Sequence, residues 1–516
     1  MKFNKQSLTD ASWYAERKIT LPKFDLPTVR DFSRKNPGWL HFGPGNIFRA
    51  FVAALQQKLL DAGKCNYGIT VATPNTREMI DKIYRPHDDL TLLVTMNPDQ
   101  SLTKTVVASI AESLSSNPDD ADDWQRLQEI VKSPSLQIIS FTITEKGYKI
   151  PAENPSRSLM GKIATLLFER YKHGATPVTL LSLDNCSHNG DVLKAGVLTA
   201  AKAQQADEKF LAYLERDVAY PWTMIDKITP RPSESVRDIL LQDGFEDMDF
   251  VASKRGGQYA PFVNAEVCEY LVVEDNFVNG RPPLEEVGVI FTQRDTVEKV
   301  ERMKVCTCLN PLHTALAVFG CLLNYKSIAA EMQDADLKQL AEQIGQEGMR
   351  VVTDPKVLSP KEFLRQCLQE RFPNPAIPDT PQRIACDTSQ KVGIRFGQTI
   401  KAYANSTELS ADDLTAIPLA VAGWCRYLMG IDDDGKIFDV SPDPLLEKLQ
   451  RNFAGKGLGE IDDVHATLAP ILSDENIWGS NLYDSGVAQK AEKFFADMAS
   501  GAHKVRTTLT QYLIRG

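Results

Sequence analysis

The sequence predicts an α/β domain with a doubly wound parallel sheet, followed by a second domain that is mainly α-helical. Two observations support this prediction. Short apolar runs alternate with amphipathic runs as far as residue 294, which is typical of strand–helix–strand units. Beyond that point the apolar residues follow the helical period. We therefore expect a first domain over residues 1–294 and a helical domain over residues 295–516.

The composition is that of an ordinary globular protein. The chain has 516 residues, of which 43% are hydrophobic and 24% are charged, and a chain of this length is expected to form more than one domain. Its formal net charge is −10, and it lacks the clustered basic residues that bind nucleic acid. Residues 1–17 are polar and lack the apolar region of a signal peptide, and no apolar run reaches the roughly 20 residues that span a bilayer. We expect a cytoplasmic protein that binds a small molecule, with no nucleic-acid or membrane partner.

The nine cysteines are scattered and odd in number, which favours free thiols in a reducing compartment. Cys306, Cys308 and His313 lie close together and could be proposed as zinc ligands. They lack the paired Cys-x-x-Cys spacing of zinc modules, so we expect no metal site. Because no heptad pattern is present, we expect a monomer or a weak dimer.

The first predicted strand covers residues 38–42, and a Gly-Pro-Gly turn at residues 43–45 follows it directly. An amphipathic helix is predicted over residues 51–60. A strand, a Gly-x-Gly turn and a helix N-terminus together form a phosphate cradle, as in Rossmann-like dinucleotide-binding domains. The third glycine of the full fingerprint is missing, so an ordinary strand–helix turn is the alternative. The predicted cofactor contacts are Gly43, Gly45, Asn46, Ile47 and Phe48.

The second predicted strand covers residues 67–72, and no acidic residue follows it at the position that usually binds the adenosine ribose. Asn75 could hydrogen-bond the ribose instead, and Arg77 could meet the 2′-phosphate of NADP. We therefore expect NAD as the cofactor, with NADP as the alternative.

Further apolar strands are predicted over residues 90–96, 136–143, 178–183 and 287–292, with helices over residues 122–132 and 156–172. Ligands of a doubly wound sheet bind beyond the carboxyl ends of its strands. The segment Asp-Asn-Cys-Ser-His-Asn-Gly at residues 184–190 follows such an end, although an ordinary loop would also contain Asn and Gly. Asp226 lies between apolar neighbours, where an acid is usually a cap or a surface residue.

Apolar periodicity predicts seven helices in the second domain, over residues 314–325, 337–347, 361–370, 414–429, 464–472, 487–498 and 504–514. A polar, proline-rich loop at residues 373–391 carries Arg383 and Lys391.

Residues 304–313, Lys-Val-Cys-Thr-Cys-Leu-Asn-Pro-Leu-His, gather a possible base and two hydrogen-bonding groups where the two domains meet in the sequence. Asn310 and Pro311 also form an ordinary helix start, with asparagine as N-cap and proline at the first helical position. Taken alone, the stretch fits a structural role as well as a catalytic one.

Six segments together resemble the polyol-specific long-chain dehydrogenase family, and they occur in the order in which the family has them. They are residues 43–50, 142–148, 184–190, 225–230, 274–282 and 309–313. The resemblance implies a nicotinamide-binding N-terminal domain, a helical C-terminal domain and hydride transfer without a metal. The expected substrate is a secondary alcohol of a sugar acid or a polyol.

The resemblance also assigns roles to individual residues. It implies that Lys304 is the general acid/base, that Asn185 and Asn310 hydrogen-bond the reacting oxygen, and that His313 is a further substrate contact. The implied substrate-binding residues are Asp226, Arg383 and Lys391. A lysine titrates near pH 10.4, so Lys304 must be desolvated or near other cations to act as a base at neutral pH.

We expect D-mannonate and D-fructuronate as the first choice of substrates. Arg383, Lys391 and Arg395 offer more positive charge than a neutral hexitol needs, and a carboxylate would use it. Mannitol and fructose, or tagaturonate, are the alternatives. A dinucleotide-binding sensor without catalysis is the alternative from another class.

Two departures from the family pattern surround Asn310. Lys304 precedes it by six residues, whereas the family has five, and the extra residue would rotate Lys304 away by about 100° on a regular helix. Pro311 has no N–H to donate to the carbonyl of Thr307, so we predict an irregular helix between residues 304 and 310. Pro311 and Leu312 also stand where the family more often has glycine and a small residue.

Overall fold

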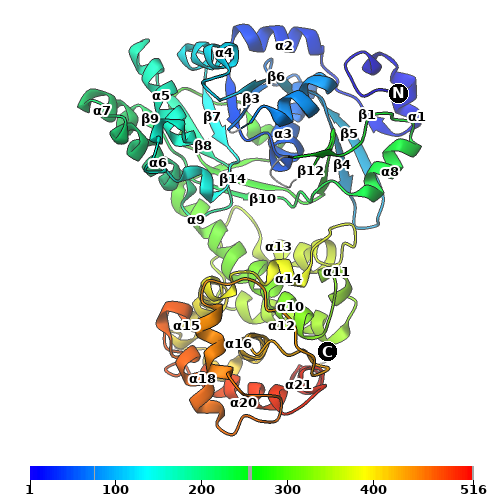
Figure 1. The fold of residues 1–516 in the computed structure, drawn as a ribbon, viewed down its shortest axis with the longest axis vertical. Coiled ribbons are helices and arrows are strands. Elements are labelled where there is room, and N and C mark those ends of the chain that lie inside the picture. The colour runs from blue at the N-terminus through cyan, green and yellow to red at the C-terminus, as the bar shows by residue number, and fades with distance from the viewer. Residues whose placement is uncertain (75, 254–257, 514–516) are drawn as a thin grey trace. The chain divides into compact units, whose positions relative to one another are not determined.

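The computed structural model describes the chain except for residues 75, 254–257 and 514–516. It divides into two compact units (Figure 1). The first unit comprises residues 1–97 and 101–298, and the second comprises residues 98–100 and 299–516.

A six-stranded parallel sheet forms the centre of the first unit, in the order β6-β3-β2-β7-β8-β9. Counted along the chain, this order is 3-2-1-4-5-6, the arrangement of dinucleotide-binding folds. The strands predicted over residues 38–42, 67–72, 136–143 and 178–183 are confirmed. The bounds are β2 (Trp39–Phe42), β3 (Ile69–Thr73), β6 (Ile110–Ser115), β7 (Ile138–Phe141), β8 (Val178–Ser182) and β9 (Val218–Ala219).

The strand predicted over residues 90–96 exists but does not belong to this sheet. β4 (Thr91–Met96) pairs antiparallel with β5 (Leu102–Val107) in a second sheet of order β1-β5-β4-β13. The third strand of the parallel sheet is β6, which the apolar pattern did not reveal. Polar residues interrupt it, and one of them, Glu112, accepts hydrogen bonds from Thr70 and Arg126.

The other strands of the first unit are short. A third sheet has the order β10-β14-β15, and β11 pairs with β12. Their bounds are β1 (Ile19–Thr20), β10 (Thr223–Asp226), β11 (Val251–Ala252), β12 (Gln258–Tyr259), β13 (Phe262–Glu266), β14 (Tyr270–Glu274) and β15 (Ile290–Thr292).

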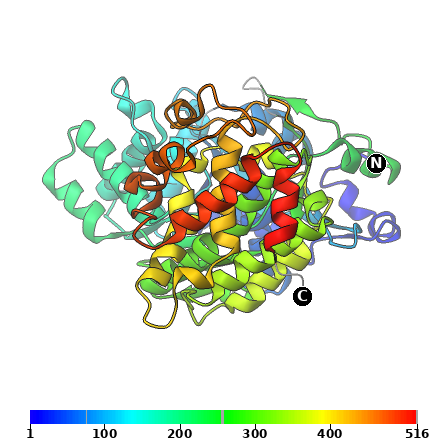
Figure 2. The same cartoon turned by 90° about the horizontal axis from the view of Figure 1, so that it is seen from below.

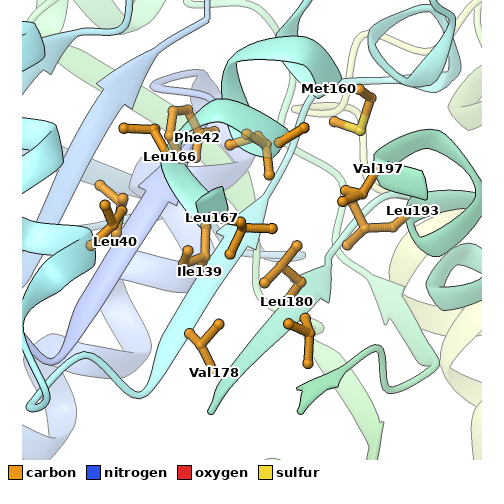
Figure 3. Close-up of a cluster of buried hydrophobic side chains, with 14 of the residues drawn as sticks. Leu40, Phe42, Ile139, Met160, Leu166, Leu167, Val178, Leu180, Leu193 and Val197 are labelled. Carbon is orange, nitrogen blue, oxygen red and sulfur yellow. The ribbon is translucent and has the colours of Figure 1, made fainter. Parts of the chain in front are cut away.

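Helices cover both faces of the parallel sheet, so its strands are apolar on both sides. On one face Leu40, Ile139 and Leu180 pack against helices α5 and α6, as Figure 3 shows. On the other face Trp39 and Ile138 pack with residues of α3. The helices of this unit are α1 (Ala11–Glu16), α2 (Leu26–Lys35), α3 (Ala53–Asp61), α4 (Ala121–Lys132), α5 (Leu159–Lys172), α6 (Asn189–Ala203), α7 (Glu208–Arg216) and α8 (Glu234–Gln242).

The described residues of the second unit are mainly helical, and all seven predicted helices are confirmed. α16 packs against α10 and α20, and α20 packs against α21. In Figure 2, α10 is green, and α16, α20 and α21 run from yellow to red. The bounds are α10 (Asn310–Leu322), α11 (Ile328–Glu331), α12 (Ala335–Met349), α13 (Pro360–Gln366), α14 (Pro381–Ile384), α15 (Gln398–Ala404), α16 (Ala416–Leu428), α17 (Leu446–Gln450), α18 (Val464–Leu472), α19 (Glu475–Trp478), α20 (Val487–Ala499) and α21 (Lys504–Tyr512).

Helix α9 (Arg294–Met303) continues through an irregular turn into α10, giving one helical segment of 29 residues. By length and composition this segment could cross a membrane, which the sequence analysis did not expect. Its apolar window is 78% buried inside the protein, as in the core helix of a globular domain. The segment is therefore only weak evidence for a membrane span.

Candidate active site

The turn after β2 is fixed between the ends of two neighbouring strands. The N–H of Gly43 donates to the carbonyl oxygen of Ala72 at 3.1 Å. Its φ is +122°, and a Cβ at this position would overlap the carbonyl oxygen of Thr142. Only glycine fits here, where the strand order reverses and doubly wound folds bind their ligands.

Gly45 has a different role, because a Cβ there would meet nothing within 4 Å. A helix begins directly after it, and the N–H of Arg49 donates to the carbonyl oxygen of Gly45 at 3.2 Å. The N–H groups of the first helical turn, from Asn46 to Phe48, therefore have no acceptor within the helix. Open space over Gly45 and donors at a helix N-terminus fit the pyrophosphate of a dinucleotide.

The side chains of the same turn face the protein. Asn46 donates to the carbonyl oxygen of Pro230 at 3.3 Å and accepts from Arg49 at 3.0 Å. Phe48 is fully buried and stacks on His41 with ring centroids 4.2 Å apart. The predicted cofactor residues therefore offer backbone N–H groups to a ligand. The side chains of Asn46 and Phe48 instead pack against the protein and stabilise the turn.

His41, which the sequence analysis did not single out, lies under this turn at the end of β2. Its ring nitrogens lie 2.7 Å from Ser140 Oγ and 2.9 Å from Thr142 Oγ1. Burial lowers the pKa of His41 to about 3. The imidazole is neutral at physiological pH, so it adds no charge beneath the cradle.

The region after β3 bears on the choice between NAD and NADP. Asn75, the predicted ribose contact, lies outside the described residues. Arg77 lies 3.1 Å from a carboxylate oxygen of Asp123, 3.6 Å from one of Asp120 and 3.5 Å from one of Asp81. Burial lowers the pKa of Arg77, but these carboxylates outweigh it and raise the pKa above its usual value. Three acids around Arg77 oppose the approach of a 2′-phosphate.

Most polar residues of the segment at 184–190 hold loops together. Asp184 accepts hydrogen bonds from the N–H groups of Ile143 and Thr144, each at 2.9 Å, and from the Tyr148 hydroxyl at 2.6 Å. Asn189 donates to Thr223 Oγ1 at 2.8 Å. Asn185 is exposed in the same loop.

Asp226 is the last residue of β10, opposite Tyr270 on β14. Asp226 is only 7% exposed. It is therefore not a surface residue, although an acid between apolar neighbours in a sequence usually is.

The predicted helix irregularity between residues 304 and 310 is confirmed. Residues Lys304–Cys308 form a π-turn, and the N–H of Leu309 donates to the carbonyl oxygen of Lys304 at 3.1 Å. A π-turn accommodates one extra residue in a helix. The six-residue separation of Lys304 and Asn310 therefore gives about the same orientation as five residues on a regular α-helix. Lys304 is 3% exposed.

The structure does not support the alternative in which Asn310 caps the helix. Leu309 occupies the N-cap position, and no side chain caps α10. The Oδ1 atom of Asn310 is buried and has no hydrogen-bond partner within the described part of the chain. A buried amide without a partner is costly, so this group fits a ligand contact better than a helix cap.

His313, one turn along α10, faces Asp379, which the sequence analysis did not identify. The Nε2 atom of His313 lies 2.9 Å from Asp379 Oδ2, but at an angle that does not make a hydrogen bond. Arg383 donates to the other oxygen of Asp379. Burial raises the pKa of Asp379, but His313 and Arg383 outweigh it and lower the pKa below its usual value. Asp379 thus compensates the positive charge of Arg383.

Lys391 and Arg395 differ from Arg383, because neither has an ion-paired carboxylate among the described residues. Lys391 Nζ donates to the carbonyl oxygen of Cys386 at 2.7 Å, and Arg395 donates to Thr314 Oγ1. Burial and the charge of Arg395 lower the pKa of Lys391, although the carboxylates of Asp387 and Asp443 act in the opposite direction. Burial alone lowers the pKa of Arg395 to about 10. The two cations therefore form a positive cluster beside α10.

Glu331, at the end of α11, is a further buried group that the sequence analysis missed. It is fully buried, and neither carboxyl oxygen has a hydrogen-bond partner among the described residues. Burial, followed by the charges of Asp379 and Asp334, raises the pKa of Glu331 well above its usual value. Folding therefore shifts the equilibrium of this carboxyl group toward its neutral form, relative to the unfolded chain.

Of the predicted residues, Lys304, Asn310, His313, Arg383 and Lys391 lie in the second unit, and Asn185, Asp226 and the glycine turn lie in the first. A search of the described residues finds no group of three or more His, Cys, Asp or Glu side chains that could hold a metal.

Known proteins match the chain over both units. The model of the mannitol dehydrogenase Rossmann domain matches residues 37–286, and that of the mannitol dehydrogenase C-terminal domain matches residues 296–498. A D-mannonate oxidoreductase from Thermotoga maritima is 48% identical, over 100% of this chain and 99% of that protein. A D-mannonate oxidoreductase from Escherichia coli is 30% identical, over 84% of this chain and 88% of that protein.

The solved structures agree on the fold. Mannitol 2-dehydrogenase from Pseudomonas fluorescens, in a ternary complex with NAD and D-mannitol, gives a TM-score of 0.72 at 26% identity and covers 99% of both chains. The predicted Rossmann-like domain and helical C-terminal domain are confirmed.

Proposed function

The chain is an oxidoreductase that belongs to the mannitol dehydrogenase family, and we propose that it interconverts D-mannonate and D-fructuronate with NAD as the cofactor. The main support is the similarity, over nearly the full length of both chains, to a D-mannonate oxidoreductase at 48% identity. In the cluster of Lys391 and Arg395, neither side chain is ion-paired with a carboxylate of the described residues, which supports a substrate that carries a carboxylate. The location in the cytoplasm and the monomeric or weakly dimeric state stay predictions.

The proposed acid/base is Lys304. A bound nicotinamide would accept or donate the hydride at the secondary alcohol carbon. In the oxidation direction Lys304 Nζ, in its neutral form, takes the hydroxyl proton as the oxygen gains alkoxide character.

Asn185 and Asn310 are the proposed donors to the reacting oxygen. Amide N–H groups stabilise negative charge where it develops and remain donors at any pH. The buried, unpartnered Oδ1 of Asn310 supports a ligand at this position. Amide oxygen and nitrogen are assigned from their surroundings, so a ligand oxygen would turn the N–H₂ group of Asn310 toward itself.

His313, Arg383, Lys391 and Asp226 are the proposed substrate contacts. Asp379 fixes His313 and Arg383 relative to each other, because it contacts both of them. Arg383 then presents donors to substrate hydroxyls with its charge already compensated.

NAD is the proposed cofactor for two reasons. The glycine turn offers backbone donors for a pyrophosphate, which NAD and NADP share. Arg77, the predicted 2′-phosphate contact, is surrounded by Asp81, Asp120 and Asp123. A 2′-phosphate would have to displace or approach these carboxylates, so NADP is disfavoured.

Mannitol 2-dehydrogenase activity is the second candidate. It is favoured by the likeness over 99% of both chains to a mannitol 2-dehydrogenase solved with D-mannitol. This candidate predicts that fructose, which carries no charge, is reduced at least as well as fructuronate.

The test is the initial rate of NADH and NADPH oxidation with fructuronate, tagaturonate and fructose. We expect turnover of fructuronate with NADH, and a kcat/KM well above those for the other two ketoses. Turnover of fructose alone would establish a polyol dehydrogenase. NADH binding without reduction of any ketose would favour the non-catalytic sensor.

A further inference from the structure

Arg395 is held in a second π-turn, Gly393–Gly397, which contacts the π-turn that carries Lys304. A Cβ on Gly393 or Gly397 would overlap the backbone carbonyl oxygens of Ile477 and Trp478. Both glycines therefore lie against the end of α19. Arg395, midway between them, projects to the opposite side of the turn, toward Thr314 on α10.

The charge of Arg395 has no acidic partner in the described part of the chain. Its side chain donates only to the Thr314 hydroxyl, and Lys391, one turn earlier, donates only to a backbone carbonyl. Arg383 differs, because Asp379 compensates its charge. A partly buried guanidinium without an acid is costly, and an anionic ligand would remove that cost.

The position of Arg395 along α10 matches the shape of a hexuronate. Thr314 accepts from Arg395 and donates to the carbonyl oxygen of Asn310 at 2.7 Å. Four residues of helix separate Asn310 from Thr314, which is about 6 Å along the axis. In fructuronate, four C–C bonds of about 1.5 Å separate the carbonyl carbon from the carboxylate carbon, a span of about 5 Å when extended.

We propose that Arg395, assisted by Lys391, binds the carboxylate of the substrate and thereby selects sugar acids over neutral polyols. The inference rests on the proposed function, in which Asn310 holds the reacting oxygen. The sequence analysis named Arg383, Lys391 and Arg395 together as positive charge for a carboxylate, and the proposal assigns the carboxylate to Arg395 because Asp379 already pairs with Arg383. Fructose places an uncharged hydroxymethyl group at this position and leaves the guanidinium without a partner.

The test compares wild type with Arg395→Gln and with Arg395→Lys, using fructuronate and fructose as substrates with NADH. We expect Arg395→Gln to lower kcat/KM for fructuronate by about 100-fold or more, the usual effect of removing one partner of a buried charge pair. The kcat/KM for fructose should stay within about threefold, and Arg395→Lys should restore part of the fructuronate rate because a cation returns without the planar fork.

Arg365→Gln is the matched control. Arg365 lies on α13 and pairs with Glu362 and Glu370. We therefore expect Arg365→Gln to leave kcat/KM unchanged for both substrates. Equal losses for both substrates in Arg395→Gln, together with a lower Tm, would show that Arg395 only supports the fold and would overturn the proposal.

Calorimetric titration separates this inference from the proposed reaction. Wild type with NADH should bind D-mannonate more tightly than D-mannitol, and Arg395→Gln should lose that difference. If no ketose turns over but mannonate binding depends on Arg395, the proposed function fails while the carboxylate site stands. If mannonate binding is the same in both proteins, the carboxylate site is refuted.

Discussion

The two units differ in the groups that they offer to a ligand. In the first unit the turn at Gly43 and Gly45 offers backbone N–H groups, while Asn46 and Phe48 are occupied by contacts within the protein. In the second unit the Oδ1 atom of Asn310 and the charge of Arg395 have no such compensation among the described residues.

This difference between the units follows from the chemistry of the two ligands, a dinucleotide and a sugar acid. A pyrophosphate is the same in every dinucleotide, so a helix N-terminus and a glycine without a side chain suffice to bind it. A sugar acid has hydroxyls and a carboxylate in a specific arrangement, which only side chains can match. The uncompensated groups of the second unit cost stability, and such costs are typical of functional sites.

The largest effect should come from Lys304, the proposed base in the second unit. Lys304→Ala should lower kcat by about 10² to 10⁴, because proton transfer by a positioned group contributes that much. NADH affinity should not change. Stopped-flow hydride transfer and NADH fluorescence titration measure the two quantities.

Lys361→Ala, at an exposed position of α13, is the control for loss of a lysine. A Lys304→Ala enzyme with wild-type kcat would show that another group moves the proton.

In the first unit the comparison predicts a variant that changes the affinity for the cofactor and not the stability of the fold. Gly45→Ala adds a methyl group to open space, so the Tm should stay the same while the Kd for NADH rises about tenfold or more, equivalent to about 1.4 kcal/mol. Gly501→Ala, at a glycine where a Cβ also has room, should change neither the Tm nor the Kd for NADH. Unchanged NADH affinity in Gly45→Ala would place the pyrophosphate elsewhere.

The cost of an uncompensated group can be measured at Glu331. Burial raises the pKa of Glu331 in the folded protein, so at low pH both states are protonated and the group has no effect on stability. As the pH rises above the unfolded pKa, only the unfolded chain ionises, and the wild type loses stability. Glu331→Gln removes this loss, so its Tm relative to wild type should rise by about 2–4 °C between pH 5 and pH 8.

Thermal unfolding across this pH range makes the measurement, with the exposed Glu408→Gln as the control. A Tm difference that is independent of pH would mean that Glu331 is ionised in the folded protein.

The smallest effect concerns the carboxylates around Arg77. Exposed ion pairs contribute at most about 1 kcal/mol, so the double variant Asp81→Asn with Asp120→Asn should raise the ratio of NADPH to NADH kcat/KM by about fivefold. Asp31→Asn, at an exposed position of α2, should leave the ratio unchanged. A ratio that does not move in the double variant would show that Arg77 does not contact the adenosine ribose.

Local patterns in the sequence determined the features that depend on neighbouring residues. The apolar runs predicted four strands of the parallel sheet and seven helices, and the Gly-Pro-Gly turn predicted the cradle after β2. The extra residue between Lys304 and Asn310, together with Pro311, predicted an irregular helix, because the geometry of a helix depends only on residues within about one turn.

Only the tertiary structure decided which groups compensate one another. β4 joins an antiparallel sheet, and β6 takes its place in the parallel sheet, because pairing between strands depends on distant partners. Asp379 lies 66 residues beyond His313 in the sequence and pairs with it through the packing of the helical unit. Among the described residues no acid is ion-paired with Arg395, and this too is a property of the folded chain, since charge compensation depends on distance in space and not on position in the sequence.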